Sequence, residues 1–320
     1  MKKFLLWTVR ITGGLIVLLI GSVVLLQYRT YDAPFPDIHA SADSVIIARG
    51  KYLVTGPAHC ADCHASPDQA SLLALGKPVS LNGGKEFKGD IGTLRAPNIT
   101  SDRETGVGNL SDGQIARALR YGVDHKGKAL FPLMPFQNLS DGDLQAIISY
   151  LRTMEPVRHE VKPKSLNALG YVVNAFFIKP VGPTGLPPGT VIADSSVTYG
   201  AYLAKNVANC VGCHTDRDLK TGAFTSEPFS GGFHMQSPLD PAYECVTPNL
   251  TPDGPTGRMT NWTETQFIQR FGMGKSITHS EMPWGPFKNM NESDLKALYR
   301  FLHTLKPVTH ETGPSLVRKQ

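Results

Sequence analysis

The hydrophobic pattern of this chain begins with one long apolar segment. Residues 4–26 are apolar or uncharged except for Arg10, and about 20 such residues span a bilayer as a helix. Arg10 lies near the N-terminal end, where its long side chain can reach back toward Lys2 and Lys3. The positive charge before the segment predicts an N-terminus inside and an exported remainder. The alternative is a cleaved signal peptide, but no small-residue cleavage site follows the apolar run closely.

Two later stretches, 140–154 and 293–305, carry the hydrophobic pattern of an amphipathic helix. In SDGDLQAIISYLRTM, Leu144, Ile147, Ile148 and Leu151 recur at i, i+3, i+4 and i+7, and SDLKALYRFLHTL repeats the pattern from Leu295. Ser140 or Asp141 can cap the first helix, and Pro156 and Pro307 can stop the two helices. Segments 46–58 and 196–208 also read as helices, while glycine-rich stretches between the helices predict loops. We therefore expect a mostly α protein with substantial loops.

The chain repeats itself at a nearly constant distance. RGKYLVTGPAHCADCH at 49–64 aligns with YGAYLAKNVANCVGCH at 199–214, an offset of 150 (199 − 49). RAPNIT at 95–100 matches VTPNLT at 246–251, and 138–157 matches 289–308, both at an offset of 151 (246 − 95 and 289 − 138). Such self-similarity predicts two copies of one domain.

The aligned segments divide the chain into an expected order of parts. The apolar run Leu169–Ile178 in the connector is too short to span a membrane, so we expect it to pack against a domain, with a short interfacial segment as the alternative. The expected parts are an anchor (1–28), a linker (29–45), domain 1 (46–158), a connector (159–195), domain 2 (196–309) and a C-terminal tail (310–320).

The distribution of charged residues supports the membrane prediction and indicates no other partner. The net charge of the 320 residues is +5, but the first 30 residues hold four basic and no acidic side chains. The remainder has 28 basic residues (32 − 4) against 27 acidic ones. This near-balance gives no electrostatic footprint for nucleic acid, so we expect no nucleic-acid partner.

The cysteines carry the candidate chemistry. Cys60, Cys63 and His64 form one CxxCH motif, and Cys210, Cys213 and His214 form a second. Zinc would need about four ligands pooled from both copies, and a disulfide would leave the adjacent histidines without a role. CxxCH is the attachment signature of c-type haem, in which two thiols bind the porphyrin and the histidine ligates the iron. The sequence therefore predicts two covalently bound haem c groups.

The order helix, CxxCH, loop, Met-Pro, helix resembles class I cytochrome c domains over nearly everything except the anchor and connector. Gly50-x-Tyr52-Leu53 and Gly200-x-Tyr202-Leu203 are similar to the family's N-terminal helix motif, which would cross the C-terminal helix near Tyr150 and Phe301. PNIT and PNLT, a TG pair, MP and SDxDL together resemble cytochrome subunits of membrane-bound alcohol and sugar dehydrogenases. The resemblance implies that the Pro97 and Pro248 carbonyls accept hydrogen bonds from the ligating histidines.

The same resemblance implies His/Met ligation of each iron. Met134 and Met282 each precede a proline at corresponding places, although aligning them needs a three-residue gap. His279, three residues before Met282, could compete for the iron, and a loop histidine is more often solvent-facing or hydrogen-bonded. Cys245 aligns with Leu94, so we expect a buried small side chain. We treat His125, His159, His234, His303 and His310 as structural or exposed, because we find no counterparts for them.

The resulting expectation is a single-pass cytochrome of the cytoplasmic membrane with its haem domains on the extracytoplasmic, periplasmic side. It would carry electrons from a dehydrogenase to an oxidase or a soluble cytochrome, and would not itself be a catalyst. The alternative is a dihaem cytochrome c peroxidase, which needs an iron with an open or displaceable ligand. A second alternative is a haem-based sensor or assembly module, which would need a further signalling domain beside the two repeats.

Overall fold

Helices dominate the computed structural model, which describes residues 1–218 and 221–319. About 38% of the chain is helical and 8% is in strands. The mostly α character is confirmed at this level. The strands form two small sheets in stretches that the sequence predicted as loops, because glycines permit tight turns there: Gly92, for example, has φ +115° in the β1–β2 hairpin.

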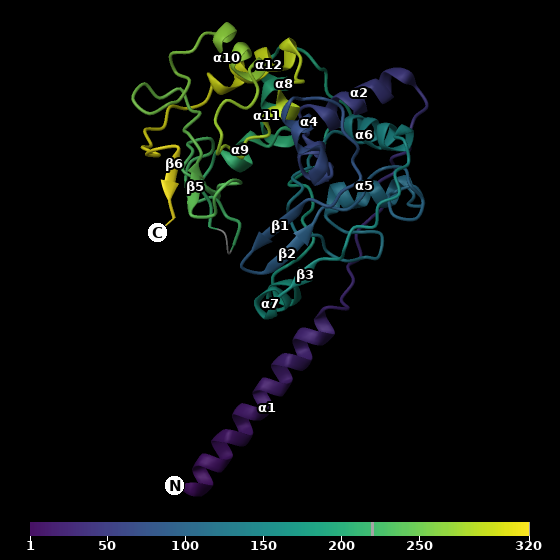
Figure 1. Ribbon diagram of the computed structural model, residues 1–320, viewed down its shortest axis with the longest axis vertical. Coiled ribbons are helices and arrows are strands. Elements are labelled where there is room, and N and C mark those ends of the chain that lie inside the picture. The colour runs from purple at the N-terminus through teal and green to yellow at the C-terminus, as the bar shows by residue number, and fades with distance from the viewer. Residues whose placement is uncertain (219–220, 320) are drawn as a thin grey trace.

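Helix α1 (Lys2–Leu26) stands apart from the rest of the molecule. None of its residues is buried, and it projects from the folded body as a rod (Figure 1). Within the described residues it is the one helix long and apolar enough to cross a membrane. A helix of this kind near the N-terminus fits a membrane anchor and a signal sequence alike.

The remaining elements fall into two halves with a common order. The first half contains α2 (Ser44–Thr55), α3 (Cys60–His64), the 3-10 turn η1 (Pro67–Gln69), α4 (Ala70–Ala74), β1 (Glu86–Gly89), β2 (Gly92–Arg95), α5 (Asp112–Tyr121), α6 (Asp141–Thr153) and β3 (Ser165–Leu166), and is followed by α7 (Ala168–Phe176). The second half contains α8 (Val197–Tyr202), the π-helical turn η2 (Leu203–Val207), α9 (Cys210–Cys213), β4 (His234–Gln236), β5 (Tyr243–Val246), α10 (Glu264–Gly272), α11 (Trp284–Phe287), α12 (Glu292–Leu302) and β6 (Leu316–Arg318).

Each half also contains one three-stranded antiparallel sheet. The strand orders are β1-β2-β3 and β4-β5-β6. The third strand comes from beyond the last long helix in both cases, and β3 and β6 begin 151 residues apart (316 − 165). The connector and the tail therefore each contribute a strand.

In each half the first helix packs on the last one through a glycine. A Cβ atom at Gly50 of α2 would lie 1.8 Å from the Ala146 carbonyl oxygen of α6, and one at Gly200 of α8 would lie 2.0 Å from the Ala297 oxygen of α12. The nearest side-chain atoms belong to Tyr150 and Phe301, both at 2.9 Å. The predicted crossings are confirmed, and they leave no room for a side chain at either glycine.

The two halves meet through a reciprocal exchange of tyrosines. Tyr52 of the first half donates its hydroxyl to Asp294 (2.8 Å) and accepts the backbone N–H of Asn291, the N-cap residue of α12 (3.1 Å). In return, Tyr202 donates to Asp143 (2.8 Å) and accepts from the N-cap N–H of Ser140 in α6 (3.0 Å). Each half therefore completes the cap of the other half's last helix.

Arg49 ties this exchange together. Its Nε donates to Asp143 Oδ1 (2.9 Å), and its Nη2 donates to the Tyr199 hydroxyl (3.1 Å). Tyr199 in turn donates to Asp294 Oδ2 (3.3 Å). Both buried carboxylates are thus hydrogen-bonded from both halves, and the two halves form one hydrogen-bonded unit.

Candidate haem sites

Both CxxCH motifs sit on short helices entered through the same unusual backbone. His59 precedes Cys60 with φ +39°, and Asn209 precedes Cys210 with φ +52°. The helix before each motif ends on a wide i to i+5 hydrogen bond, from Ala58 N–H to the Leu53 carbonyl and from Ala208 N–H to the Leu203 carbonyl (2.9 and 2.8 Å). A wide turn followed by a left-handed residue redirects the chain so that α3 and α9 start in a new direction.

The motif thiols are free and their surroundings keep them protonated. Burial raises the pKa of Cys60 to about 12, with the neighbouring Cys63 adding to the effect, and raises that of Cys63 to about 11. In the second half, burial raises the pKa of Cys210 to about 12 and that of Cys213 above its ordinary value. A redox-active dithiol works through a thiolate, which needs a lowered pKa. These half-buried thiols fit attachment to an apolar porphyrin better.

A pooled zinc site is not formed. Among residues 1–218 and 221–319, no group of three or more His, Cys, Asp or Glu side chains converges in a way that could hold a metal ion.

The two motif histidines have the same hydrogen-bonding surroundings. The Nδ1 of His64 is hydrogen-bonded to the Pro97 carbonyl (2.9 Å), and that of His214 to the Pro248 carbonyl (3.0 Å). These are the bonds that the resemblance implied. Burial lowers the pKa of both rings, although the carbonyl partner acts the other way. A neutral ring that donates from Nδ1 presents a free lone pair at Nε2, which is what an iron ligand requires.

The PNIT and PNLT segments hold these carbonyls in place. Asn98 Nδ2 donates to the Val157 carbonyl (2.8 Å) and to Thr105 Oγ1 (3.0 Å), and its Oδ1 accepts from the backbone N–H and hydroxyl of Thr100. Asn249 makes the same set of bonds with Val308, Thr256 and Thr251 in the second half. Asn98 and Asn249 are buried. Each asparagine therefore fixes the loop beside the ligating histidine to the segment after the last helix.

Two histidines that we treated as unmatched are equivalent. His159 Nδ1 bonds the Asn82 carbonyl (2.7 Å), and His310 Nδ1 bonds the Ser230 carbonyl (3.0 Å). Their positions differ by 151 (310 − 159), so the repeat offset applied to every histidine would have found the pair. The expectation that the two histidines lack counterparts was wrong, while their expected structural role agrees with the equivalent hydrogen bonds of the two rings.

Both candidate methionine ligands are half-buried and lie in irregular segments before the last helix of their half. The Met134 carbonyl accepts from Gln137 Nε2 (2.8 Å), and the Met282 N–H donates to Ser280 Oγ (3.2 Å). The two methionines, Cys60 and Cys210 all pack against the same hydrophobic core cluster. Their ligation of iron stays a prediction.

His279 and Cys245 are held by other groups. His279 Nδ1 bonds Ser237 Oγ (2.9 Å), and Cys245 Sγ donates to the His279 carbonyl. Cys245 lies buried on β5 opposite Met235, as Leu94 lies on β2 opposite Phe87. The expected buried position of Cys245 is confirmed, and its pKa is raised by burial.

The interface between the halves brings the two motifs near each other. The His59 ring, beside Cys60, lies edge-on to Phe287 of α11 with ring centroids 5.6 Å apart. A Cβ atom at Gly285 of α11 would lie 1.9 Å from the Leu73 oxygen of α4, so these short helices are in close contact. The charge of Glu281 acts on both Cys63 and Cys213.

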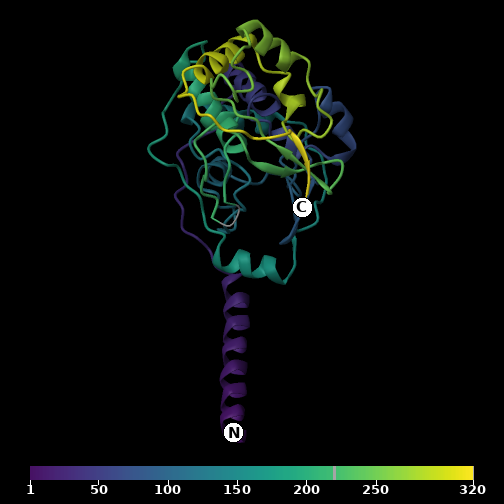
Figure 2. The ribbon, with the colours of Figure 1, turned by 90° about the vertical axis from the view of Figure 1, so that its left-hand side faces the viewer.

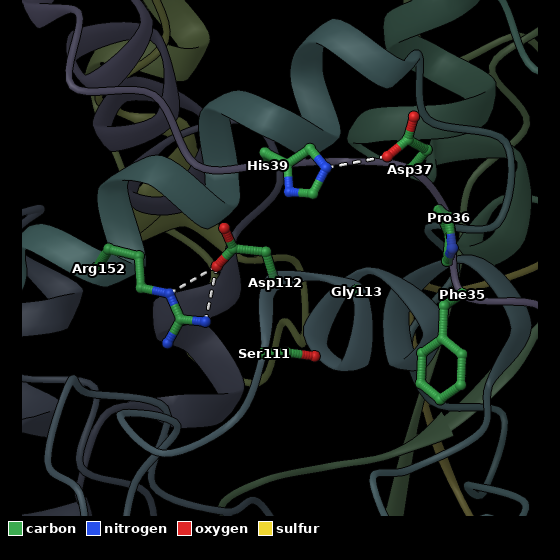
Figure 3. A pocket seen from close by; sticks show the side chains of 8 residues that line it. All are labelled: Phe35, Pro36, Asp37, His39, Ser111, Asp112, Gly113 and Arg152. Atoms are coloured by element: carbon green, nitrogen blue, oxygen red, sulfur yellow. Dashed lines mark hydrogen bonds and ion pairs between the residues drawn. The ribbon is translucent and has the colours of Figure 1, made fainter.

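A surface hollow between the 35–39 segment, α5 and α6 is a different feature (Figure 3). Its polar groups are paired with one another: Arg152 Nε donates to Asp112 Oδ1 (2.8 Å), and His39 Nε2 is 2.9 Å from Asp37 Oδ1. None of its eight lining residues belongs to a CxxCH motif.

Sequence comparisons give the chain its relatives. It is 28% identical over 294 residues to the cytochrome c subunit of the quinone alcohol dehydrogenase of Gluconobacter oxydans, covering 86% of this chain and 58% of that subunit. It is 25% identical over 316 residues to the fructose dehydrogenase cytochrome subunit of Gluconobacter japonicus, covering 94% of this chain and 60% of that protein. A diheme cytochrome c-type protein of Cereibacter sphaeroides is 26% identical over 200 residues, covering 60% of this chain and 63% of that protein.

No protein-family model matches the chain. The chain spans less than two thirds of the length of the relatives named above. At about 25–28% identity over most of its length, the chain is a homologue of the cytochrome c subunits of alcohol, gluconate and fructose dehydrogenases.

Proposed function

We propose that this protein is a membrane-anchored cytochrome c with two haem groups that passes electrons from a dehydrogenase to the respiratory chain. The observation that carries the proposal is the duplicated site: a CxxCH motif whose histidine is neutral and hydrogen-bonded through Nδ1 to a proline carbonyl, present in both halves. The names of the relatives support both a dehydrogenase partner and a haem count of two.

Each half would be one cytochrome c domain, residues 46–158 and 196–309. Cys60, Cys63 and His64 would hold the first haem together with Met134, and Cys210, Cys213 and His214 would hold the second together with Met282. When bound, a haem of this kind accepts and releases one electron at its iron. With six ligands the iron offers no open position, so the protein would be a carrier rather than a catalyst.

The fold supplies what a relay between two such centres needs. The neutral histidines offer Nε2 and keep their orientation through the proline carbonyls, which are held by Asn98 and Asn249. The tyrosine exchange fixes one half against the other, and the motifs approach each other through His59 and α11. An electron could therefore enter through one half and leave through the other without a binding step between them.

The location follows from α1. We propose that it stays uncleaved as a single-pass anchor in the cytoplasmic membrane and that both haem domains lie on the periplasmic side. The donor would be a dehydrogenase, and the acceptor an oxidase or a soluble cytochrome.

Haem content per chain tests the proposal directly. We expect two covalent haems in the wild-type protein, one in Cys60→Ala/Cys63→Ala, one in Cys210→Ala/Cys213→Ala, and two in the matched control Cys245→Ala. The amount is measured from haem absorbance and from intact mass. Full haem content in either double variant, or loss of haem in the Cys245 control, would refute the site assignment.

Ligation by methionine is tested in the same preparation. The near-infrared absorption of the oxidised protein should show the Met-to-iron charge-transfer band for both haems, and Met134→Ala or Met282→Ala should each remove half of it. A band missing from the wild-type protein would instead indicate an open or differently ligated iron, and peroxide turnover would then be the function to measure.

A further inference from the structure

Helix α7 lies at the point where α1 meets the folded body. Figures 1 and 2 show it next to the body end of α1, and Figure 2 shows it running across the α1 axis. The contact is made by Gln27, the residue directly after the apolar run of α1. Its Nε2 donates to the Tyr171 carbonyl (2.9 Å), and its Oε1 accepts from Asn174 Nδ2 (2.6 Å).

This contact fixes the height of α7 relative to a bilayer. A helix of 25 residues is about 37 Å long, and the hydrocarbon core of a bilayer is about 30 Å thick. If α1 spans the membrane, the end of its apolar run at Leu26 marks the hydrocarbon boundary and Gln27 lies in the interfacial layer. Helix α7, which is bonded to Gln27, then lies in the same layer.

The other side of α7 is held rigidly by the protein. Asn167 caps the helix, and its Nδ2 donates to the Asp90 carbonyl in the β1–β2 turn (2.8 Å). A Cβ atom at Gly170 would lie 2.0 Å from the Ile91 oxygen, so the helix packs directly on that turn. The helix is therefore a fixed part of the body.

The apolar stripe of α7 is exposed at both ends, while Val172 and Val173 in its middle are half-buried. Leu169, Val172, Val173 and Phe176 recur at i, i+3, i+4 and i+7, and Phe177 follows. Leu169 is 54% exposed and Phe177 is 66% exposed. A helix with one capped, packed side and an apolar outer side is the pattern of elements that lie in the plane of a membrane surface.

We infer that α7 is an interfacial helix whose Leu169–Phe177 face rests in the outer leaflet of the bilayer that α1 spans. This inference rests on the proposed anchor and extends it, because a second contact would fix the tilt and rotation of both halves above the membrane. The charged residues in the segments that contact or flank the helix are four basic (Arg29, Lys128, Lys164 and Lys179) and two acidic (Asp90 and Asp124). We take the exposed apolar face, and not this small basic excess, to lead the contact.

Photolabelling from within the bilayer tests the inference. The full-length protein is reconstituted into phosphatidylcholine vesicles with a lipid-soluble aryl diazirine, and the modified peptides are identified by mass spectrometry. Leu186 and Ile192 in the connector are the matched reference, because they are even more exposed, at 99% and 83%, and their segment is bonded to the start of α6 through Pro188 and Gly189. We expect several-fold more label on residues 168–178 than on residues 183–193.

The outcomes separate this inference from the anchor proposal. Label on α1 together with equal labelling of α7 and residues 183–193 would overturn the inference and leave the anchor intact. No label on α1 would overturn the anchor, and the inference with it. In Leu169→Glu/Phe177→Glu we expect labelling of α7 to drop to the connector level while label on α1 and haem content stay unchanged. Leu186→Glu/Ile192→Glu should change nothing on α7.

A second measurement tests the apolar character of the contact. Labelling of α7 should change little between phosphatidylcholine vesicles and vesicles containing phosphatidylglycerol, because α1 already holds the helix at the membrane and its apolar face makes the contact. A several-fold increase with the anionic lipid would show a contact led by charge and would contradict the apolar assignment.

Discussion

At the scale of single residues, the carboxylates of Asp294 and Asp253 have their pKa values shifted in opposite directions. Burial raises the pKa of Asp294, although the hydroxyl of Tyr52 and the charge of Arg49 act the other way. The pKa of Asp253 is lowered, mainly by hydrogen bonds from Thr256. The two residues should therefore give stability a pH dependence of opposite sign.

This sign can be measured with two isosteric variants. An aspartate has a pKa of about 3.9 in an unfolded chain. Native Asp294 binds more protons than the unfolded chain above that pH, so its contribution to stability is lost as pH rises. Native Asp253 binds fewer, so its contribution is present above that pH and is lost as pH falls. Between about pH 4 and 7, the stability of wild type relative to Asp294→Asn should fall with rising pH, whereas relative to Asp253→Asn it should stay nearly constant and then fall as the pH drops below about 4.

Urea unfolding of the holoprotein at several pH values checks this. Effects of pH on haem ligation are common to all three proteins and cancel in the differences. If both differences change with the same sign, the assignment of Asp294 as a carboxylate destabilised by burial is incorrect.

At the scale of elements, the pairing of first and last helices depends on two glycines. Gly50 and Gly200 lie where the helix backbones cross, and a methyl group there would meet a carbonyl oxygen at 1.8 or 2.0 Å. The backbones must separate to admit it. Overpacking of this kind costs about 1–3 kcal/mol or more.

We therefore expect Gly50→Ala and Gly200→Ala each to lower the free energy of unfolding by at least about 2 kcal/mol. Gly272 in α10 is the matched control, because a Cβ atom there meets nothing within 4 Å. Gly272→Ala should be neutral or stabilise by up to about 1 kcal/mol through helix propensity. Chemical unfolding followed by circular dichroism measures all three, and a neutral Gly50→Ala would contradict the close crossing.

At the scale of the whole molecule, the two halves are joined by hydrogen bonds that neither half can make alone. The Tyr52 and Tyr202 hydroxyls each donate to a carboxylate of the opposite half and accept from its N-cap N–H. Losing one hydroxyl leaves a buried donor and a buried carboxylate with one partner fewer. Hydrogen bonds to charged groups contribute about 1.5–3 kcal/mol each.

Tyr52→Phe and Tyr202→Phe should therefore each destabilise the protein by about 1–3 kcal/mol. In the double variant the unfolding transition should broaden, because part of the coupling between the halves is lost while the Arg49–Tyr199 bond and the contact of α4 with α11 remain. Tyr171→Phe, at an exposed tyrosine, should change stability by less than about 0.5 kcal/mol. Differential scanning calorimetry distinguishes these cases, and one sharp transition in the double variant would mean that other contacts couple the halves.

Residue type, spacing and repetition were enough to predict the features that depend on local chemistry. These are the span-length helix and the two CxxCH motifs, whereas the glycine crossings and the proline carbonyl partners were predicted from the resemblance to class I cytochromes c. The small sheets were missed, because β3 and β6 become strands only by pairing with hairpins far away in sequence. The equivalence of His159 and His310 could have been read from the sequence, because both lie in a shared PVxHE stretch (156–160 and 307–311) at the repeat offset.

The placement of the two halves and of the membrane helix could be learned only from the folded chain. Tyr52 and Tyr202 read in sequence as parts of a helix motif, but their hydroxyls find partners 242 and 59 residues away. The apolar run at Leu169–Ile178 could equally pack inward, and its exposed face and its bonds to Gln27 appear only when α1 and the β1–β2 turn are in place. Long-range partners of this kind leave no periodic signal, because their geometry depends on the whole chain.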